Sequence, residues 1–328
     1  MRDIFEFVDN FKKYHHVKSN LQYGDTALCP NPYFSVIMPV YGNPKYFVHS
    51  FNSVVHQDAD FSYEVIIVDN TPIDDTKSDV LKLVESANLP YVFYYRNEEN
   101  IGMSGNWNRG IELARANLLT FCHDDDMLYP NCLSKLWELH LKYPNKFIIP
   151  SCKIIDESVI YPLKKSSNTK SWGKECIVYD KIDILMANPT NGVGCLFYKK
   201  HMKEFGGYNE DYYPSMDNAL HVKYVYKIGA IRFRQILYCY RITNNNESNN
   251  VYQGFIDNGL FYAQCMIRYI TLPLFVKKAL IHAYKTNITI VMEKVWARKI
   301  ALSQRLTIPD RLVNGLLFCR QLLKIYVL

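Results

Sequence analysis

Short apolar runs alternate with segments of helical periodicity between residues 34 and about 156. The apolar runs have the length of buried strands, and the segments between them repeat apolar residues every three or four positions. Strands separated by helices favour βαβ units, and hence a mostly parallel sheet covered on both faces. The sequence therefore predicts an α/β fold, with strands at 34–41, 63–69, 91–96, 118–123 and 147–154 and helices at 78–86, 104–116 and 130–142.

Polar residues follow the first, second and fourth of these strands. They are the segment 41–43, the pair Asp69-Asn70, and the triplet 124–126, which consists of three aspartates. The carboxyl ends of parallel strands meet at one edge of a sheet, where open α/β sheets bind ligands. Clustered carboxylates repel one another, so a divalent cation that bridges to a phosphorylated ligand is favoured. An acidic turn that caps the next helix is the alternative.

Size and charge narrow the class of protein. A chain of 328 residues can bury a full α/β domain and an appendage without disulfides. Its nine cysteines are scattered and form no C-x-x-C pair, which predicts reduced thiols in a cytoplasmic protein and no zinc site. Residues 277–328 hold ten basic and two acidic side chains, net +8, whereas the first 276 hold 28 and 30, net −2. The excess of basic residues therefore lies in the tail and not at the sheet edge. This argues against a nucleic-acid-binding site at that edge.

Five segments, in this order along the chain, resemble segments of family 2 glycosyltransferases of the GT-A fold. These enzymes are inverting, and the resemblance is to those of the bacterial surface-polysaccharide type. The five segments are 35–41, 64–70, 100–111, 124–130 and 206–210, the last followed by Asp217. The resemblance covers residues 34 to about 242 and implies a Rossmann-like, mostly parallel sheet flanked by helices. One such segment would be weak support, and five in order are strong support.

The resemblance implies a role for each site residue. It places Pro39, Val40 and Tyr41 along the nucleobase, Asp69 on the base or ribose, and Asp124 on the ribose. It implies that Asp126 holds Mn²⁺ or Mg²⁺ on the diphosphate, where the ion acts as a Lewis acid. Asp217 would take the proton from the acceptor hydroxyl during a single, inverting displacement. The implied nucleotide-sugar site comprises Pro39, Val40, Tyr41, Asp69, Asn97, Gly102, Asp124 and Asp125.

Three positions depart from the family pattern. His123 stands where the family commonly has Asp, so the triplet can register with Asp124 or Asp125 as its first member. Asn70 replaces a common second Asp. Met216 replaces the Glu that usually precedes the base, which leaves Asp211 as an alternative base. No Gln-x-x-Arg-Trp motif occurs, which argues against a processive polysaccharide synthase.

The organisation along the chain follows from these motifs. We expect a lead-in segment at 1–33, with Phe5, Val8 and Phe11 on one helical face, and a glycosyltransferase domain at 34–254. The domain divides into a nucleotide-binding half, 34–156, and an acceptor half, 157–254. A helical basic region follows at 255–328. Within it, the spacing of apolar residues in 311–328 predicts an interfacial helix on an anionic membrane, or a face that packs on the domain or on a second subunit.

The expected function is metal-dependent sugar transfer from a nucleotide sugar to a hydroxyl group. Family grounds favour a UDP-sugar donor and a glycan or polyprenyl-diphosphate-linked acceptor, in the biosynthesis of a polysaccharide such as O-antigen or capsule. The expected location is cytoplasmic, with peripheral attachment to the inner membrane face, and a homo-oligomer is compatible with it. One rival is a non-catalytic sugar-nucleotide-binding or scaffold protein, which loss of the carboxylates would signal. Another is a sugar-1-phosphate nucleotidyltransferase, which would need a Gly-rich phosphate loop that 41–44 does not supply. A Rossmann dehydrogenase is excluded because no G-x-G-x-x-G follows the first strand.

Overall fold

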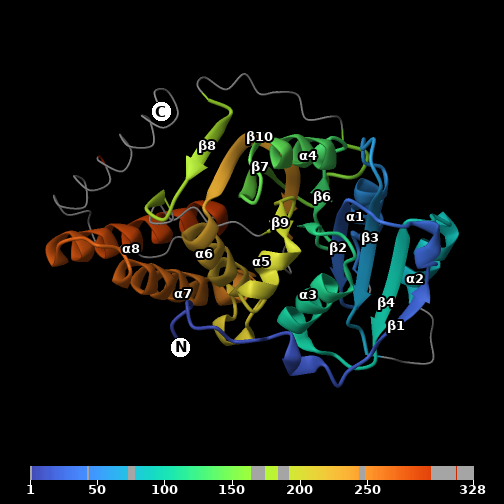
Figure 1. Cartoon of the computed structure of the whole chain (residues 1–328), viewed down its shortest axis with the longest axis horizontal. Coiled ribbons are helices and arrows are strands. Elements are labelled where there is room, and N and C mark those ends of the chain that lie inside the picture. The colour runs from blue at the N-terminus through green and yellow to red at the C-terminus, as the bar shows by residue number, and fades with distance from the viewer. Residues whose placement is uncertain are drawn as a thin grey trace.

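A six-stranded sheet is the larger of the two sheets in the described residues (Figure 1). The computed structural model of the chain describes residues 2–42, 44–72, 78–163, 174–183, 192–243 and 248–296, together with Gly315. The strand order is β1-β4-β3-β2-β5-β9, in which β4, β3, β2 and β5 are parallel and the two edge strands pair antiparallel. The strands are β1 (Ser19–Tyr23), β2 (Phe34–Val40), β3 (Tyr63–Asp69), β4 (Val92–Asn97), β5 (Leu118–Phe121) and β9 (Phe197–Tyr198).

The order of the strands creates a switch point between β2 and β5. From β2 the chain adds β3 and then β4 on one side, whereas β5 joins on the other side. In open α/β sheets a crevice forms outside the carboxyl ends of two such neighbouring strands. The segments that follow β2 and β5 begin at Tyr41 and Cys122, so the fold brings two of the predicted polar segments to this crevice.

Helices cover both faces of the sheet, as the alternation of apolar runs predicted. Val36 and Met38 point into one core cluster with α1 (Phe47–Val55), α2 (Asp79–Ala87) and α4 (Cys132–Lys142). Ile37, between them in sequence, belongs to the other cluster, because successive side chains of a strand alternate between faces. That second cluster includes residues of α3 (Gly102–Leu113) and α6 (Met216–Ile228), and the short α5 (Lys199–Glu204) lies nearby.

A second, smaller sheet adjoins the first. It contains β6 (Met127–Leu128), β10 (Ala230–Arg241), β7 (Phe147–Ile155) and β8 (Cys176–Tyr179). The strand β10 begins at Ala230, and residues 230–233 pair with both β7 and β8. The last residue of β10, Arg241, contacts the aspartate triplet. The short strand β6 directly follows the triplet in the chain.

The N-terminal segment differs from the helical lead-in expected at 1–33. It contains only 3₁₀ turns at Lys12–Tyr14 and Thr26–Leu28, and Ser19–Tyr23 adds β1 to the edge of the sheet. Ile4 and Phe11 are buried in the core that contains α6. The helical spacing was misleading because tertiary contacts, not a helix of its own, bury these side chains.

Two long helices form the end of the described chain, α7 (Ser248–Arg268) and α8 (Leu274–Trp296). The expected boundary at 254/255 falls inside α7. The interfacial helix predicted at 311–328 lies outside the described residues, apart from Gly315. No helix in the described ranges combines the length and the apolar content that a bilayer crossing requires. The eight cysteines in these ranges are free thiols, and six of them are buried.

Candidate active site

Arg241 holds the aspartate triplet in place from the end of β10. Its backbone N–H donates to Asp126 Oδ1 at 2.8 Å, and its Nε donates to the carbonyl oxygen of Asp125 at 2.8 Å. Its guanidinium also lies 4.3 Å from the ring centroid of Tyr46. Asp126 is fully buried as a result, whereas Asp124 and Asp125 remain partly exposed at the sheet edge.

The surroundings of the three aspartates raise the pKa values of their carboxyl groups. Burial, followed by the charge of Asp125, raises the pKa of Asp124 to about 7, and a hydrogen bond with the Tyr41 backbone opposes the shift. Burial also raises the pKa of Asp125 and raises that of Asp126 well above its usual range. A divalent cation would stabilise the ionised form of these adjacent carboxyl groups, whose pKa values are raised. Their oxygens suit Mg²⁺ and Mn²⁺.

The two carboxylate oxygens of Asp126, the expected metal ligand, have different surroundings. One of its carboxylate oxygens is bound by a backbone N–H and the other is buried near His123, whose Nδ1 lies 3.6 Å away. Burial lowers the pKa of His123 to about 4, so that contact involves a neutral ring at pH 7. Asp124 and Asp125 are the carboxylates that reach the open edge. Within the described residues no three His, Cys, Asp or Glu side chains are grouped to hold a metal.

The ends of β2 and β3 meet beside the triplet, as the sequence predicted. The charge of Asp69 contributes to the raised pKa of Asp124, so the two carboxylates are neighbours. Asp69 itself is fully buried, where its oxygens accept from the Thr71 backbone at 2.8 Å and from the Tyr94 hydroxyl. It therefore caps the turn after β3.

The three residues expected along the nucleobase are not equivalent. Pro39 and Val40 are buried in β2, and Val40 packs in the core. Tyr41, the next residue, is 59% exposed. Because the strand ends at Val40, only Tyr41 presents an aromatic ring at the crevice.

A buried network of amide side chains fixes the loop before α3. Asn70 Oδ1 accepts from Asn97 Nδ2 and from the backbone N–H of Ile101, both at 3.0 Å. Asn97 also donates to Asn106 Oδ1 at 3.0 Å. Gly102 begins α3 with φ +70° and open space around it, so glycine is required there by the backbone. Asn97 thus fixes the loop from its buried side, and Gly102 lies on its exposed side.

Asp217, the base that the resemblance implies, lies in the first turn of α6. Its Oδ1 accepts from the Asn218 N–H at 2.8 Å, and burial raises its pKa to about 7. Its charge contributes to the raised pKa of Tyr208, which places the two side chains close together. Asp211, the alternative base, is exposed on a 3₁₀ turn, whereas Asp217 is half-buried.

A chain of aromatic rings connects this acceptor side to the triplet. Tyr208 meets Trp107 edge-on at 4.9 Å, and Trp107 stacks on His123 at 5.3 Å. Asn108 fixes Tyr208 by accepting from its N–H and donating to its carbonyl, both at 2.8 Å. The sequence analysis assigned no role to Trp107, Asn108 or Arg241. The first two could have been found from the helix that follows the Asn-x-Gly stretch, but no local signal marks Arg241.

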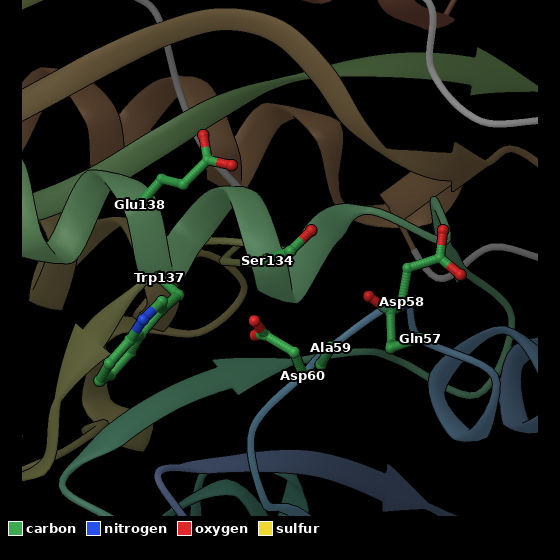
Figure 2. A pocket seen from close by; sticks show the side chains of 7 residues that line it. All are labelled: Gln57, Asp58, Ala59, Asp60, Ser134, Trp137 and Glu138. Carbon is green, nitrogen blue, oxygen red and sulfur yellow. The ribbon is translucent and has the colours of Figure 1, made fainter.

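The pocket in Figure 2 is separate from this crevice. It has a volume of about 540 Å³ and is lined by Asp58, Asp60 and Glu138 beside Trp137. Its loop residues precede β3, and Trp137 packs against Phe34 at the start of β2. The pocket therefore lies at the amino ends of the strands, opposite the ligand-binding edge.

Comparisons with known proteins agree with this geometry. A Campylobacter jejuni protein named GalNAc(5)-diNAcBac-PP-undecaprenol beta-1,3-glucosyltransferase is 29% identical over 231 residues, which cover 69% of this chain and 71% of that protein. An uncharacterised Mycobacterium tuberculosis protein is 31% identical over 105 residues, so the match spans about a third of either chain, 32% and 31%.

Solved structures show the same fold. S. aureus TarS 1-349 in complex with UDP-GlcNAc aligns with a TM-score of 0.59 at 16% identity, covering 89% of this chain and 81% of that one. The mannosyltransferase PcManGT from Pyrobaculum calidifontis, in complex with GDP-Man and Mn²⁺, aligns with a TM-score of 0.51 at 12% identity, covering 90% and 82%. The family profile described as Glycosyl transferase family 2 matches residues 35–199. The chain therefore belongs to glycosyl transferase family 2 and has the GT-A fold.

Proposed function

We propose that the chain is a metal-dependent inverting glycosyltransferase that uses a UDP-sugar and a lipid-linked glycan acceptor. The observation that carries the proposal is the meeting of Tyr41 and Asp124 at the switch point, with Asp217 connected to them through Tyr208 and Trp107. A donor site and a base on its acceptor side are the two parts that a single displacement needs.

The donor would lie along the carboxyl ends of β2, β3 and β5. The exposed ring of Tyr41 would stack on the nucleobase, and Asp124 would accept hydrogen bonds from the ribose. The backbone around Gly102 leaves room for the donor above the amide network. UDP is favoured because TarS, which shares this fold, is described in complexes with UDP and UDP-GlcNAc.

Asp125 would hold the divalent ion, and Asp126 would fix the turn that presents Asp125. The ion, when bound, supplies positive charge that stabilises the departing diphosphate. A Mn²⁺ complex of PcManGT supports the choice of ion. Asp125 is favoured over the originally expected Asp126 because its carboxylate is the partly exposed one of the two.

Asp217 would act as the general base. With a pKa of about 7 it is substantially ionised at neutral pH and still basic enough to accept a proton. It would take the proton of the acceptor hydroxyl as that oxygen bonds to the anomeric carbon and the bond to the nucleoside diphosphate breaks. Attack from the opposite side inverts the anomeric configuration.

The acceptor is proposed from the Campylobacter jejuni relative, whose name specifies an undecaprenyl-diphosphate-linked glycan. A role in surface-polysaccharide assembly at the inner membrane face follows from such an acceptor. The rival interpretation as a binding or scaffold protein is weaker because the carboxylates expected of the enzyme are present in the sequence.

A screen of nucleotide sugars for metal-dependent hydrolysis and transfer tests the proposal. We expect turnover of a UDP-sugar with Mn²⁺ or Mg²⁺ and its loss in EDTA, with recovery when the ion is restored. Undiminished turnover in EDTA would refute the metal requirement alone. Tight nucleotide-sugar binding without turnover on any lipid-linked acceptor would instead favour the non-catalytic rival.

A further inference from the structure

The turn between α7 and α8 carries large apolar side chains on its outside. Tyr269, Leu274 and Phe275 are 51%, 69% and 75% exposed, and all three lie within seven consecutive residues. Single exposed apolar residues are common on protein surfaces, but a group of them indicates an interaction site. Figure 1 shows α7 and α8 at one end of the molecule, away from β1 to β4.

An apolar groove with a basic rim continues from this turn. Leu260 and Ile267 line it from α7, and Leu274 and Ile281 from α8, around a volume of about 620 Å³. On α8, the groove-lining residues Leu274, Lys278, Ile281 and Lys285 recur at helical spacing. Leu280, Ala283 and Tyr284 are buried on the other side of the same helix. The hairpin is thus anchored by one face and presents an amphipathic second face to its surroundings.

The rim has one sign of charge. No Asp or Glu occurs between Asp257 and Glu293, whereas Arg268, Lys277, Lys278 and Lys285 all border the groove. The acidic group that the structure places nearby is Asp3, whose carboxylate lies 3.6 Å from the Arg268 guanidinium. Lys277 and Lys278 therefore give this surface a net positive charge that Asp3 does not cancel.

We propose that this surface, formed by the α7–α8 turn and groove, docks on the anionic phospholipid headgroups of a bilayer. Leu274 and Phe275 would enter the boundary between headgroups and acyl chains, and the lysines would lie at the level of the phosphates. Tyr269 has the amphipathic ring that suits the same depth.

Charge argues against the other occupants. The C-terminal segment 297–328 carries six basic residues and one acidic residue, so it has the same sign as the groove. A second copy of this face would also be repelled. An acidic protein would satisfy the lysines, but it gives no reason for an exposed Leu and Phe at the tip of a turn. The inference rests on the proposed function only for its consequence, namely that a lipid-linked acceptor would be met in the plane of this surface.

Vesicle flotation of the full-length protein tests the docking directly. We expect binding to mixed phosphatidylglycerol–phosphatidylcholine vesicles at low salt, and little binding to phosphatidylcholine alone. Each lysine near an anionic surface is worth about fivefold in affinity, so Lys277→Glu with Lys278→Glu should weaken binding by at least about 25-fold. Phe275→Ser should weaken it by about tenfold through the lost apolar contact.

Matched controls lie elsewhere on the surface. Lys12→Glu with Lys82→Glu reverses two lysines whose side chains are 75% and 58% exposed. Leu141→Ser removes an apolar side chain that is 64% exposed. Both controls should bind anionic vesicles within about twofold of the unaltered protein.

Three outcomes would overturn the proposal: no flotation with anionic vesicles, equal losses in the hairpin and control variants, or binding to polyglutamate without binding to vesicles. Donor hydrolysis measured without vesicles reports on the proposed reaction independently. Flotation without turnover would therefore reject the reaction and keep the docking surface.

Discussion

Asp125 and Asp126 are neighbours in the chain, but their carboxylates have different surroundings. Asp126 is enclosed and bound by the backbone of Arg241, whereas Asp125 is partly exposed at the sheet edge. A carboxylate in the first setting shapes the turn, and one in the second is available to a cation. The two roles can be separated by substitution.

We expect Asp125→Asn to lower metal-dependent turnover by at least about 10²-fold while the melting temperature is kept. Asp126→Asn should preserve turnover within about tenfold, because its amide oxygen can still accept from the Arg241 N–H. Asp126→Ala leaves that buried N–H without an acceptor and should cost about 1–3 kcal/mol in the free energy of unfolding. Steady-state kinetics and urea denaturation measure the two effects. A larger kinetic loss in Asp126→Asn than in Asp125→Asn would restore Asp126 as the ligand.

Asp217 gives a prediction about pH and catalysis. Its pKa of about 7 means that the base is protonated below neutrality, so kcat/KM should rise with pH and level off above about 7. Asp217→Asn should lower kcat by about 10²–10⁴-fold and remove this limb, with donor affinity nearly unchanged. A collapse of donor affinity would assign Asp217 to the donor site instead.

The same shift predicts a stability difference. The folded state holds the Asp217 proton up to about pH 7, whereas the unfolded chain releases it near the ordinary value of 3.8. This carboxyl therefore costs stability progressively between about pH 4 and pH 7, and fully above that. Asp217→Asn should stabilise the protein at pH 8 by up to about 4 kcal/mol, with no gain below about pH 4. Melting curves at the two pH values measure it, and equal gains at both would contradict the assigned titration.

At the level of the elements, α3 connects the two halves of the site. Its Asn106 accepts from Asn97 at the end of β4 and donates to the Val68 carbonyl oxygen of β3, and Asn108 binds both backbone polar groups of Tyr208. Gly207 packs so closely against Asn108 that a Cβ there would lie 2.5 Å from Oδ1. The acceptor segment is thus positioned by α3 and not only by its own sequence.

Asn108→Ala should cost about 2–4 kcal/mol in unfolding free energy, because two buried backbone groups lose their partners. It should raise the KM for acceptor more than the KM for donor, since Tyr208 adjoins Asp217. Asn52→Ala, whose amide bonds only within its own helix, is the matched control and should be near neutral. Equal effects on both substrates would mean that Asn108 does not serve the acceptor side in particular.

At the level of the whole molecule, the N-terminal segment connects regions that are distant in sequence. It adds β1 to the sheet, buries Ile4 and Phe11 in the core with α6, and brings the Phe5 ring to 4.6 Å from that of Tyr226. Residues 2–23 therefore belong to the folded unit and not to a detachable leader.

Ile4→Ala should cost about 2–5 kcal/mol in unfolding free energy through the cavity it leaves. Phe7→Ala, at a side chain that is 66% exposed, should cost under about 0.5 kcal/mol. Chemical denaturation of both variants checks the contrast. Similar small losses would show that the segment is not part of the cooperative core.

The sequence alone predicted strands β2, β3, β4, β5 and β7 and helices α2, α3 and α4, because each has the periodicity that burial on one or both faces imposes, but it did not predict the short strand β6. It also predicted the edge of the sheet at which Tyr41, Asp69 and Asp124 meet, since parallel strands place their carboxyl ends together. It could not separate the aspartates of the triplet, because their burial depends on Arg241, more than one hundred residues later. The helix expected in the N-terminal segment was wrong for the same reason. The apolar residues of this segment are buried by distant helices, and contacts between remote parts of a chain leave no local pattern in the sequence. Local periodicity fixed the elements, and long-range packing decided which side chains remain free for chemistry.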